Sequence, residues 1–164
     1  MDAPNDGGFN MVSHTHVKPR QRASRLSLEM LESRVLLSTT YIVNSVLDGA
    51  PALDGNLTLR EAIEAANSDV AVGDAAAGTG ADTITFDAAL AGQFINLTEI
   101  ADSTFRASAL AITSDITIDG ADAPFLTIGQ DGTGGDKRLF IVQGGGDLTL
   151  QNITLSGGVA QGED

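Results

Sequence analysis

Short alternations of apolar and polar residues dominate the chain from Asp82 onward. The segments TITF, FINLT, LAITSDITIDG, FLTIGQ, LFIV and DLTLQNITLSGG contain brief runs rich in β-branched residues. Gly, Asp and Asn separate these runs, as is usual for tight turns. A period of two predicts short β-strands that each bury one face, with no helix between them.

Several of these strand segments resemble one another. SDITIDG and GDLTLQNITLSGG both run Asp–apolar–Thr–apolar, and Asp115 and Asp147 lie 32 residues apart. Repeats of roughly 20–50 residues are typical of stacked, solenoid-like folds. The pattern predicts an all-β fold, a right-handed, single-stranded parallel β-helix of few coils with aliphatic ladders inside and Thr side chains outside. A β-sandwich is the alternative, but it normally has longer strands joined by hairpins.

One stretch, LTLREAIEAAN, has helical periodicity instead. Leu59, Ala62, Ile63 and Ala66 share one face, which predicts a helix over residues 58–67 that closes the N-terminal end of the coils. Thr58 precedes Glu61 by three positions, and this spacing predicts a capping box. Asn67 suits the C-terminal end of the helix.

The same stretch holds the one tight acid–base cluster of the chain, Arg60, Glu61 and Glu64. These residues could form a catalytic base with an electrostatic helper. The helical interpretation is favoured, because it gives Glu61 a capping role and leaves Glu64 in solvent.

The chain divides into four segments. Residues 1–24 are expected to be disordered, and residues 25–38 to form an amphipathic sorting segment. Residues 39–81 are expected to form an N-terminal cap with one strand over 41–47, the helix and a flexible linker. Residues 82–164 are expected to form the coils, ending as a truncated stack.

Composition and charge narrow the function. The chain has 164 residues, 42% of them apolar, enough for one domain with a core. Without Cys, neither disulfides nor thiolate metal sites can form. Residues 39–164 carry four basic and 18 acidic groups, which disfavours nucleic acid and anionic lipid as partners.

Targeting signals are weak. No apolar run approaches the roughly 18–20 residues needed to cross a membrane, so no membrane span is predicted. Glu29, Glu32 and Arg34 interrupt the best candidate for a secretory signal. Translation could begin at Met1 or at Met11.

Two motifs resemble known families. LEMLESRVLLS resembles the Leu-Glu-Pro-Arg-x-Leu-Leu sorting motif of exported planctomycete proteins, with Ser33 in place of Pro. The matching residues are Leu31, Glu32, Arg34, Leu36 and Leu37. This resemblance implies export to the cell envelope or to the outside of the cell.

TLREAI resembles the Cys-Ser-Leu-Arg-Glu-Ala-type motif at the start of bacterial extracellular β-helix proteins, with Leu57 where the family has Cys. The likeness extends over residues 41–158. It implies similarity to polymorphic outer-membrane proteins and to pectate-lyase-like surface proteins, many of them with no assigned activity.

The remaining candidate sites are weaker. Asp131 and Asp136 in DGTGGD could hold Ca²⁺, although a simple loop between strands is favoured. His14 and His16 are too few for a metal site. Asp115 and Asp119 are four apart on one strand, about 13 Å along an extended backbone, too far for a glycosidase pair. Asn56, Asn96 and Asn152 begin Asn-x-Thr sequences, and Asn152 is expected at a corner between strands, with its amide bonded to backbone.

No catalytic, cofactor-binding or metal-binding residue is therefore predicted. The expected function is a non-enzymatic, exported or cell-surface module for adhesion, or for binding carbohydrate or protein. The alternatives are a remnant or subunit of a carbohydrate-active, pectate-lyase-like enzyme, and a truncated product without independent function. The last coil would expose a strand edge, which suggests end-to-end self-association.

Overall fold

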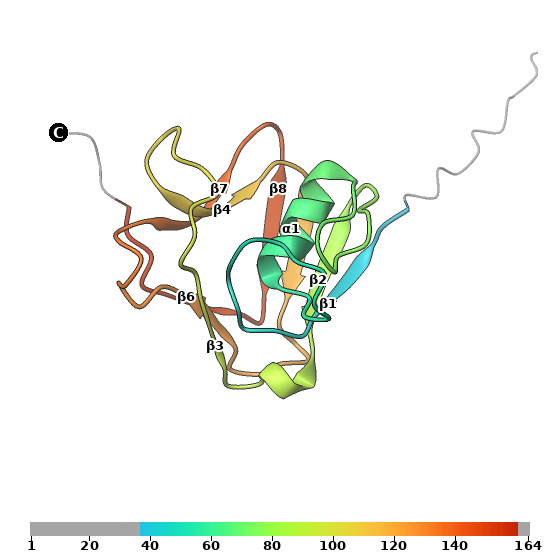
Figure 1. Cartoon of the computed structure of the whole chain (residues 1–164), viewed down its shortest axis with the longest axis horizontal. Coiled ribbons are helices and arrows are strands. Elements are labelled where there is room, and N and C mark those ends of the chain that lie inside the picture. The colour runs from blue at the N-terminus through green and yellow to red at the C-terminus, as the bar shows by residue number, and fades with distance from the viewer. Residues whose placement is uncertain (1–36, 161–164) are drawn as a thin grey trace, which may run out of the picture. The chain divides into compact units, whose positions relative to one another are not determined.

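The structure is a computed structural model that describes residues 37–160 (Figure 1). The predicted tail over 1–24 and nearly all of the predicted sorting segment over 25–38 lie outside the described residues. None of the helices in the described part of the chain is long and apolar enough to cross a membrane.

Residues 37–160 form nine short strands, one α-helix and one turn of 3₁₀ helix, η1 (Ala88–Leu90). The α-helix is α1 (Leu59–Ser68). The strands are β1 (Thr40–Val43), β2 (Asp82–Phe86), β3 (Phe94–Asn96), β4 (Ser108–Ile112), β5 (Asp115–Asp119), β6 (Thr127–Gly129), β7 (Arg138–Val142), β8 (Asp147–Gln151) and β9 (Thr154–Ser156).

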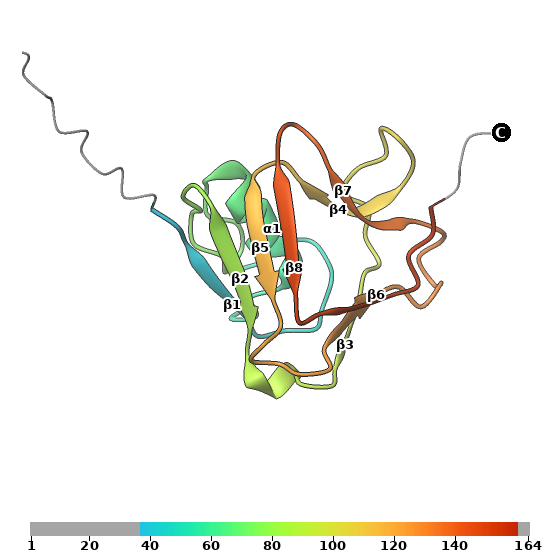
Figure 2. The same cartoon turned by 180° about the vertical axis from the view of Figure 1, so that it is seen from behind.

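All paired strands run parallel and belong to three sheets, in the orders β1-β2-β5-β8, β3-β6-β9 and β4-β7. From β2 onward the chain visits the three sheets in a fixed rotation and returns to the first sheet at β5 and at β8. The four strands of the first sheet lie side by side in Figure 2, with β8 at one edge. The fold is therefore β-rich, built from parallel sheets and one helix.

The repeats seen in the sequence set the register of these sheets. Asp115 lies opposite Asp147, as their 32-residue spacing predicts, and Thr127 lies opposite Thr154. Inside the first sheet, Ile84 and Ile118 stack in register and are fully buried. Thr side chains at alternate positions face outward, so the period of two is obeyed.

Helix α1 packs against strands of two sheets and buries a face of small and aliphatic residues, namely Leu59, Ala62, Ile63, Ala65 and Ala66. Thr58 accepts a hydrogen bond from the Glu61 amide, while the Glu61 carboxylate accepts one from the Thr58 amide. The predicted capping box is confirmed.

Three local predictions need correction. Asn67 does not end α1; the helix continues to Ser68, and Asp69 forms the C-cap with a left-handed φ of 52°. The first strand stops at Val43 rather than residue 47. The linker after α1, which was expected to be flexible, packs against the rest of the domain. Ala75 is buried, and the Tyr41 hydroxyl donates to the Ala76 carbonyl.

Candidate functional site

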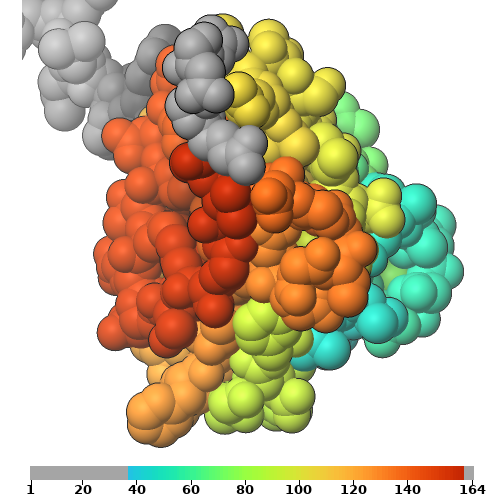
Figure 3. All heavy atoms as spheres, turned by 90° about the vertical axis from the view of Figure 1, so that its left-hand side faces the viewer, coloured from blue at the N-terminus to red at the C-terminus, as the bar shows by residue number. Residues whose placement is uncertain are grey.

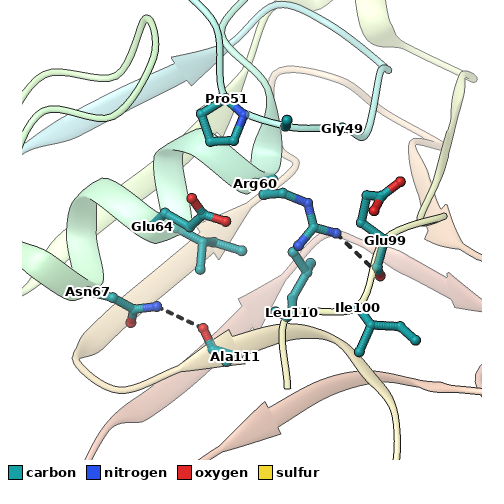
Figure 4. A pocket seen from close by; sticks show the side chains of 12 residues that line it. Gly49, Pro51, Arg60, Glu64, Asn67, Glu99, Ile100, Leu110 and Ala111 are labelled. Carbon is teal, nitrogen blue, oxygen red and sulfur yellow. Dashed lines mark hydrogen bonds between the residues drawn. The ribbon is translucent and has the colours of Figure 1, made fainter. Parts of the chain in front are cut away.

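A cavity of about 400 Å³ opens beside α1 (Figure 4). Its walls come from one face of α1, the loop over 49–51, the segment over 99–101 and strand β4. Apolar side chains form much of the wall, among them Pro51, Ile63, Ile100 and Leu110. Arg60, Glu64, Asn67 and Glu99 supply the polar side chains. The volume lies within the range of roughly 300–1,000 Å³ that is usual for small-molecule sites.

Arg60 is a buried residue that lines this cavity, and it forms an ion pair with Asp48. Its Nε lies 2.7 Å from Oδ1 of Asp48, and its Nη2 donates to Oδ2 at 3.0 Å. The Arg60 Nη1 also donates to the Ala109 carbonyl at 2.9 Å. A two-pronged pair of this kind fixes the plane of the guanidinium group.

Asp48 connects three parts of the chain. Besides binding Arg60, its Oδ2 accepts hydrogen bonds from the amides of Thr98 at 2.7 Å and Glu99 at 3.0 Å. In the sequence, Asp48 lies between the predicted strand over 41–47 and the predicted helix over 58–67, and no role is predicted for it. The neighbouring Gly49 and Pro51 indicate only a turn. No local pattern predicts that Asp48 accepts hydrogen bonds from residues as far as 51 positions away.

Glu61 belongs to the scaffold. Its Oε2 accepts from the Thr58 amide and hydroxyl, and its Oε1 accepts from the Ala52 amide at 2.9 Å. Two of the three members of the acid–base cluster are therefore held in structural contacts. The expectation that α1 is structural holds for Arg60 and Glu61.

Glu64 departs from its prediction. It is half-buried rather than fully solvated, and its side chain lies at the cavity beside Arg60 and below Pro51 in the view of Figure 4. No donor within residues 37–160 hydrogen-bonds to its carboxylate. Burial raises the pKa of Glu64; the charge of Arg60 partly opposes this rise, while Glu61 and Asp48 add to it.

Asn67 lies one helical turn beyond Glu64. Its amide nitrogen donates to the Ala111 carbonyl at 2.7 Å, while its oxygen accepts from the Thr113 amide at 2.8 Å. One N–H of Asn67 and one N–H of Arg60 remain without an acceptor in the described part of the chain. The cavity is thus lined by the half-buried Asn67, the nearly buried Arg60 and a half-buried Glu64 carboxylate that receives no hydrogen bond from residues 37–160.

The other predicted positions do not form a second site of this kind. Asp131 is exposed, and its carboxylate accepts from the amide and hydroxyl of Thr133, which lowers its pKa. Over residues 37–160, no three His, Cys, Asp or Glu side chains are grouped to hold a metal ion. Asp136 lines a separate, smaller cavity with Lys137 and Arg138. His14 and His16 lie outside the described residues.

The acidic and amide positions on the strands have structural contacts. Asn152 turns the chain between β8 and β9 with a φ of 53°, as expected for a corner. Its amide donates to the Asp119 carboxylate at 2.8 Å rather than to backbone. The Asn96 side-chain oxygen accepts from the Asp131 backbone amide, and the Asn56 backbone amide donates to the carboxylates of Asp54 and Asp74. Asp115 is exposed on the outer face of the first sheet.

Comparison of the chain with protein-family models, curated proteins and solved structures found no match. The class of protein is thus given by the fold alone: a β-rich domain of three parallel sheets closed by one helix. The chemistry of the cavity is the remaining guide to function.

Proposed function

We propose that this protein is a right-handed, single-stranded parallel β-helix that acts as a non-enzymatic, exported or cell-surface module and binds carbohydrate in the cavity beside α1. The fixed rotation of the chain among three parallel sheets supports the β-helix. A β-sandwich is built from antiparallel hairpins, whereas every pair among the named strands is parallel. The resemblance of Leu31–Leu37 to a sorting motif supports export.

The binding proposal is carried by the Glu64 carboxylate, which receives no hydrogen bond from residues 37–160 and lines the same cavity as Arg60 and Asn67. A sugar hydroxyl both donates and accepts hydrogen bonds, so neighbouring hydroxyls can donate to Glu64 and accept from Arg60 and Asn67. The C–H faces of a sugar ring can pack on Pro51 and Ile100, which line the cavity and are exposed. Among residues 37–160, no aromatic side chain lines the cavity, so weak binding is expected.

The charges at the cavity favour neutral sugars over acidic ones. Glu64 and Glu99 line the cavity with carboxylates that have no ion-pair partner among residues 37–160, while the charge of Arg60 is matched by Asp48. The acidic surface adds to this field. Neutral oligosaccharides therefore fit better than uronic acid polymers, which argues against a pectate-like substrate.

Isothermal titration calorimetry with neutral glucose and xylose oligomers and with oligogalacturonate tests this proposal. We expect binding of a neutral oligomer, loss of binding in Glu64→Gln, and retention in Asp115→Asn. The second variant makes the same chemical change on the outer face of the first sheet. Absence of binding to every neutral oligomer, or unchanged binding in Glu64→Gln, would overturn the proposal.

One observation favours the alternative of a carbohydrate-active enzyme. A half-buried carboxyl with a raised pKa is what a glycosidase uses as general acid. Such an enzyme would cleave one of the same oligomers, and Glu64→Gln would abolish cleavage while the oligomer still bound. Analysis of the reducing ends after long incubation distinguishes the two functions.

A further inference from the structure

Strand β8 is the outermost strand of the first sheet, since no other strand in residues 37–160 pairs with its far side. The Asp147 amide donates to the Ser114 carbonyl, and the Gly120 amide donates to the Gln151 carbonyl. The odd-numbered residues of β8 therefore bond toward β5. By the alternation of a parallel ladder, the peptide groups of Leu148 and Leu150 point outward.

The apolar side chains at this edge are incompletely covered. Ile116 and Ile118 are only 2% and 0% exposed, whereas Leu148 and Leu150, which lie opposite them one coil later, are only half-buried. Leu155 of β9 is 45% exposed, although its register partner Ile128 is fully buried. Figure 3 shows the C-terminal strands at the molecular surface of this end. An unpaired, partly apolar edge favours pairing with another strand.

We infer that the occupant of this edge is a second copy of the same chain, with the two β8 strands antiparallel around a two-fold axis at Thr149. In this register Leu148 of one copy lies opposite Leu150 of the second copy. The peptide groups of both residues point away from β5, so each pair of Leu148 with Leu150 of the second copy exchanges two hydrogen bonds. The register uses all five residues of β8, and the contact is self-complementary, as a two-fold interface requires.

The side chains of β8 complement one another by hydrogen bonding in this register. Asp147 of each copy lies opposite Gln151 of the second copy, so a carboxylate meets an amide instead of another carboxylate. Thr149 meets Thr149 of the second copy, a cross-strand pair that is favourable in antiparallel sheets. In-register parallel pairing of two copies would instead place Asp147 beside Asp147. The inference depends on the observed sheet and not on carbohydrate binding, so either proposal can fail without the other.

Cysteine cross-linking gives a direct test, because the chain has no native Cys. Thr149 lies opposite Thr149 of the second copy in a non-hydrogen-bonded pair, in which the two Cα atoms lie about 4.5 Å apart. This distance is at the short end of the range of about 4.4–6.8 Å between the Cα atoms of a disulfide. Thr149→Cys should form a disulfide-linked dimer on mild oxidation. Thr117→Cys, the equivalent position in the previous coil, should remain monomeric on the same gel.

The register has its own test. A mixture of Asp147→Cys and Gln151→Cys chains should form mostly the mixed disulfide, and neither variant should cross-link well alone. Light scattering of the unmodified full chain should give twice the monomer mass, and Thr149→Lys should halve it by placing two like charges together. A monomeric unmodified chain, or equal cross-linking of Thr149→Cys and Thr117→Cys, would overturn the inference. Circular dichroism verifies that each variant is folded.

Discussion

The Arg60 Nε lies 2.7 Å from the Asp48 Oδ1, with only 5% and 1% of the two side chains exposed. This buried ion pair joins α1 to the loop that precedes it and to the amides of Thr98 and Glu99. The pair therefore fixes both the helix and one wall of the cavity.

Removing one partner of this pair should be strongly destabilising. Asp48→Ala leaves the Arg60 guanidinium buried without its counter-charge, which typically costs about 3–5 kcal/mol. We expect urea denaturation to show a loss of this size in the free energy of unfolding. Asp122→Ala, which removes an exposed carboxylate, is the matched control and should change it by less than about 0.5 kcal/mol.

A double replacement separates loss of charge from loss of packing. Asp48→Leu with Arg60→Met removes both charges and keeps apolar volume, so it should recover much of the stability lost in Asp48→Ala. If the double variant is no more stable than Asp48→Ala, the hydrogen bonds to Thr98, Glu99 and Ala109 outweigh the ion pair.

The capping box gives a second prediction. Thr58→Ala removes the side chain that accepts from the Glu61 amide and should lower the free energy of unfolding by about 1 kcal/mol. Glu61→Ala should cost more, because Glu61 also accepts from Ala52. Thr58→Ser retains the hydroxyl and should behave like the unmodified chain in thermal unfolding. Equal loss in Thr58→Ser and Thr58→Ala would mean that the methyl group matters rather than the cap.

The parts of this molecule that could be predicted from sequence depend on local spacing. Thr58 and Glu61 are three residues apart, so the capping box is visible without the fold. The similarity of the segments around Asp115 and Asp147 reports a repeat, and the repeat gives the register. Strand positions followed from the period of two for the same reason.

The cavity could not be predicted because its contacts are long-range. Asp48 meets Thr98 and Glu99 only after the chain has passed through α1, β2 and β3. Glu64 has a polar position on a helical wheel, so solvent was the natural expectation. It becomes half-buried because the loop over 49–51 and the segment over 99–101 also wall the cavity. Neither segment carries a sequence signal for this arrangement.

The titration of the Tyr41 phenol can be followed by absorbance without overlap from other residues, because the chain has one Tyr and no Trp. Burial, followed by the nearby charges of Asp82 and Asp69, raises the pKa of Tyr41 from 10.0 to about 12. The neutral phenol is thus favoured in the folded state. Its contribution to stability is complete below pH 10, the unfolded value, and is lost as the pH rises through about 12. Tyrosinate absorbance should show a midpoint near 12 in the folded chain and near 10 in urea; coincident midpoints would contradict the buried phenol.

Glu64 should link stability and binding to pH in opposite directions. Burial raises its folded pKa above the usual 4.5, so the folded state holds this proton more tightly than the unfolded state does. Stability from this group is therefore complete below pH 4.5 and is lost as the pH rises through the raised folded pKa. Relative to Glu64→Gln, the unmodified chain should lose stability across this window, as measured by urea denaturation at several pH values.

Ionisation of Glu64 strengthens its capacity to accept hydrogen bonds. Affinity for a neutral oligosaccharide should therefore rise over the same pH window in which stability falls, and Asp115→Asn should show both trends. If affinity in the unmodified chain does not change with pH while ¹³C carboxyl shifts show Glu64 titrating, the carboxylate does not contact the sugar. In that event Arg60 and Asn67 would be the groups to test next by calorimetry, beginning with Asn67→Ala, which leaves the Arg60–Asp48 pair intact.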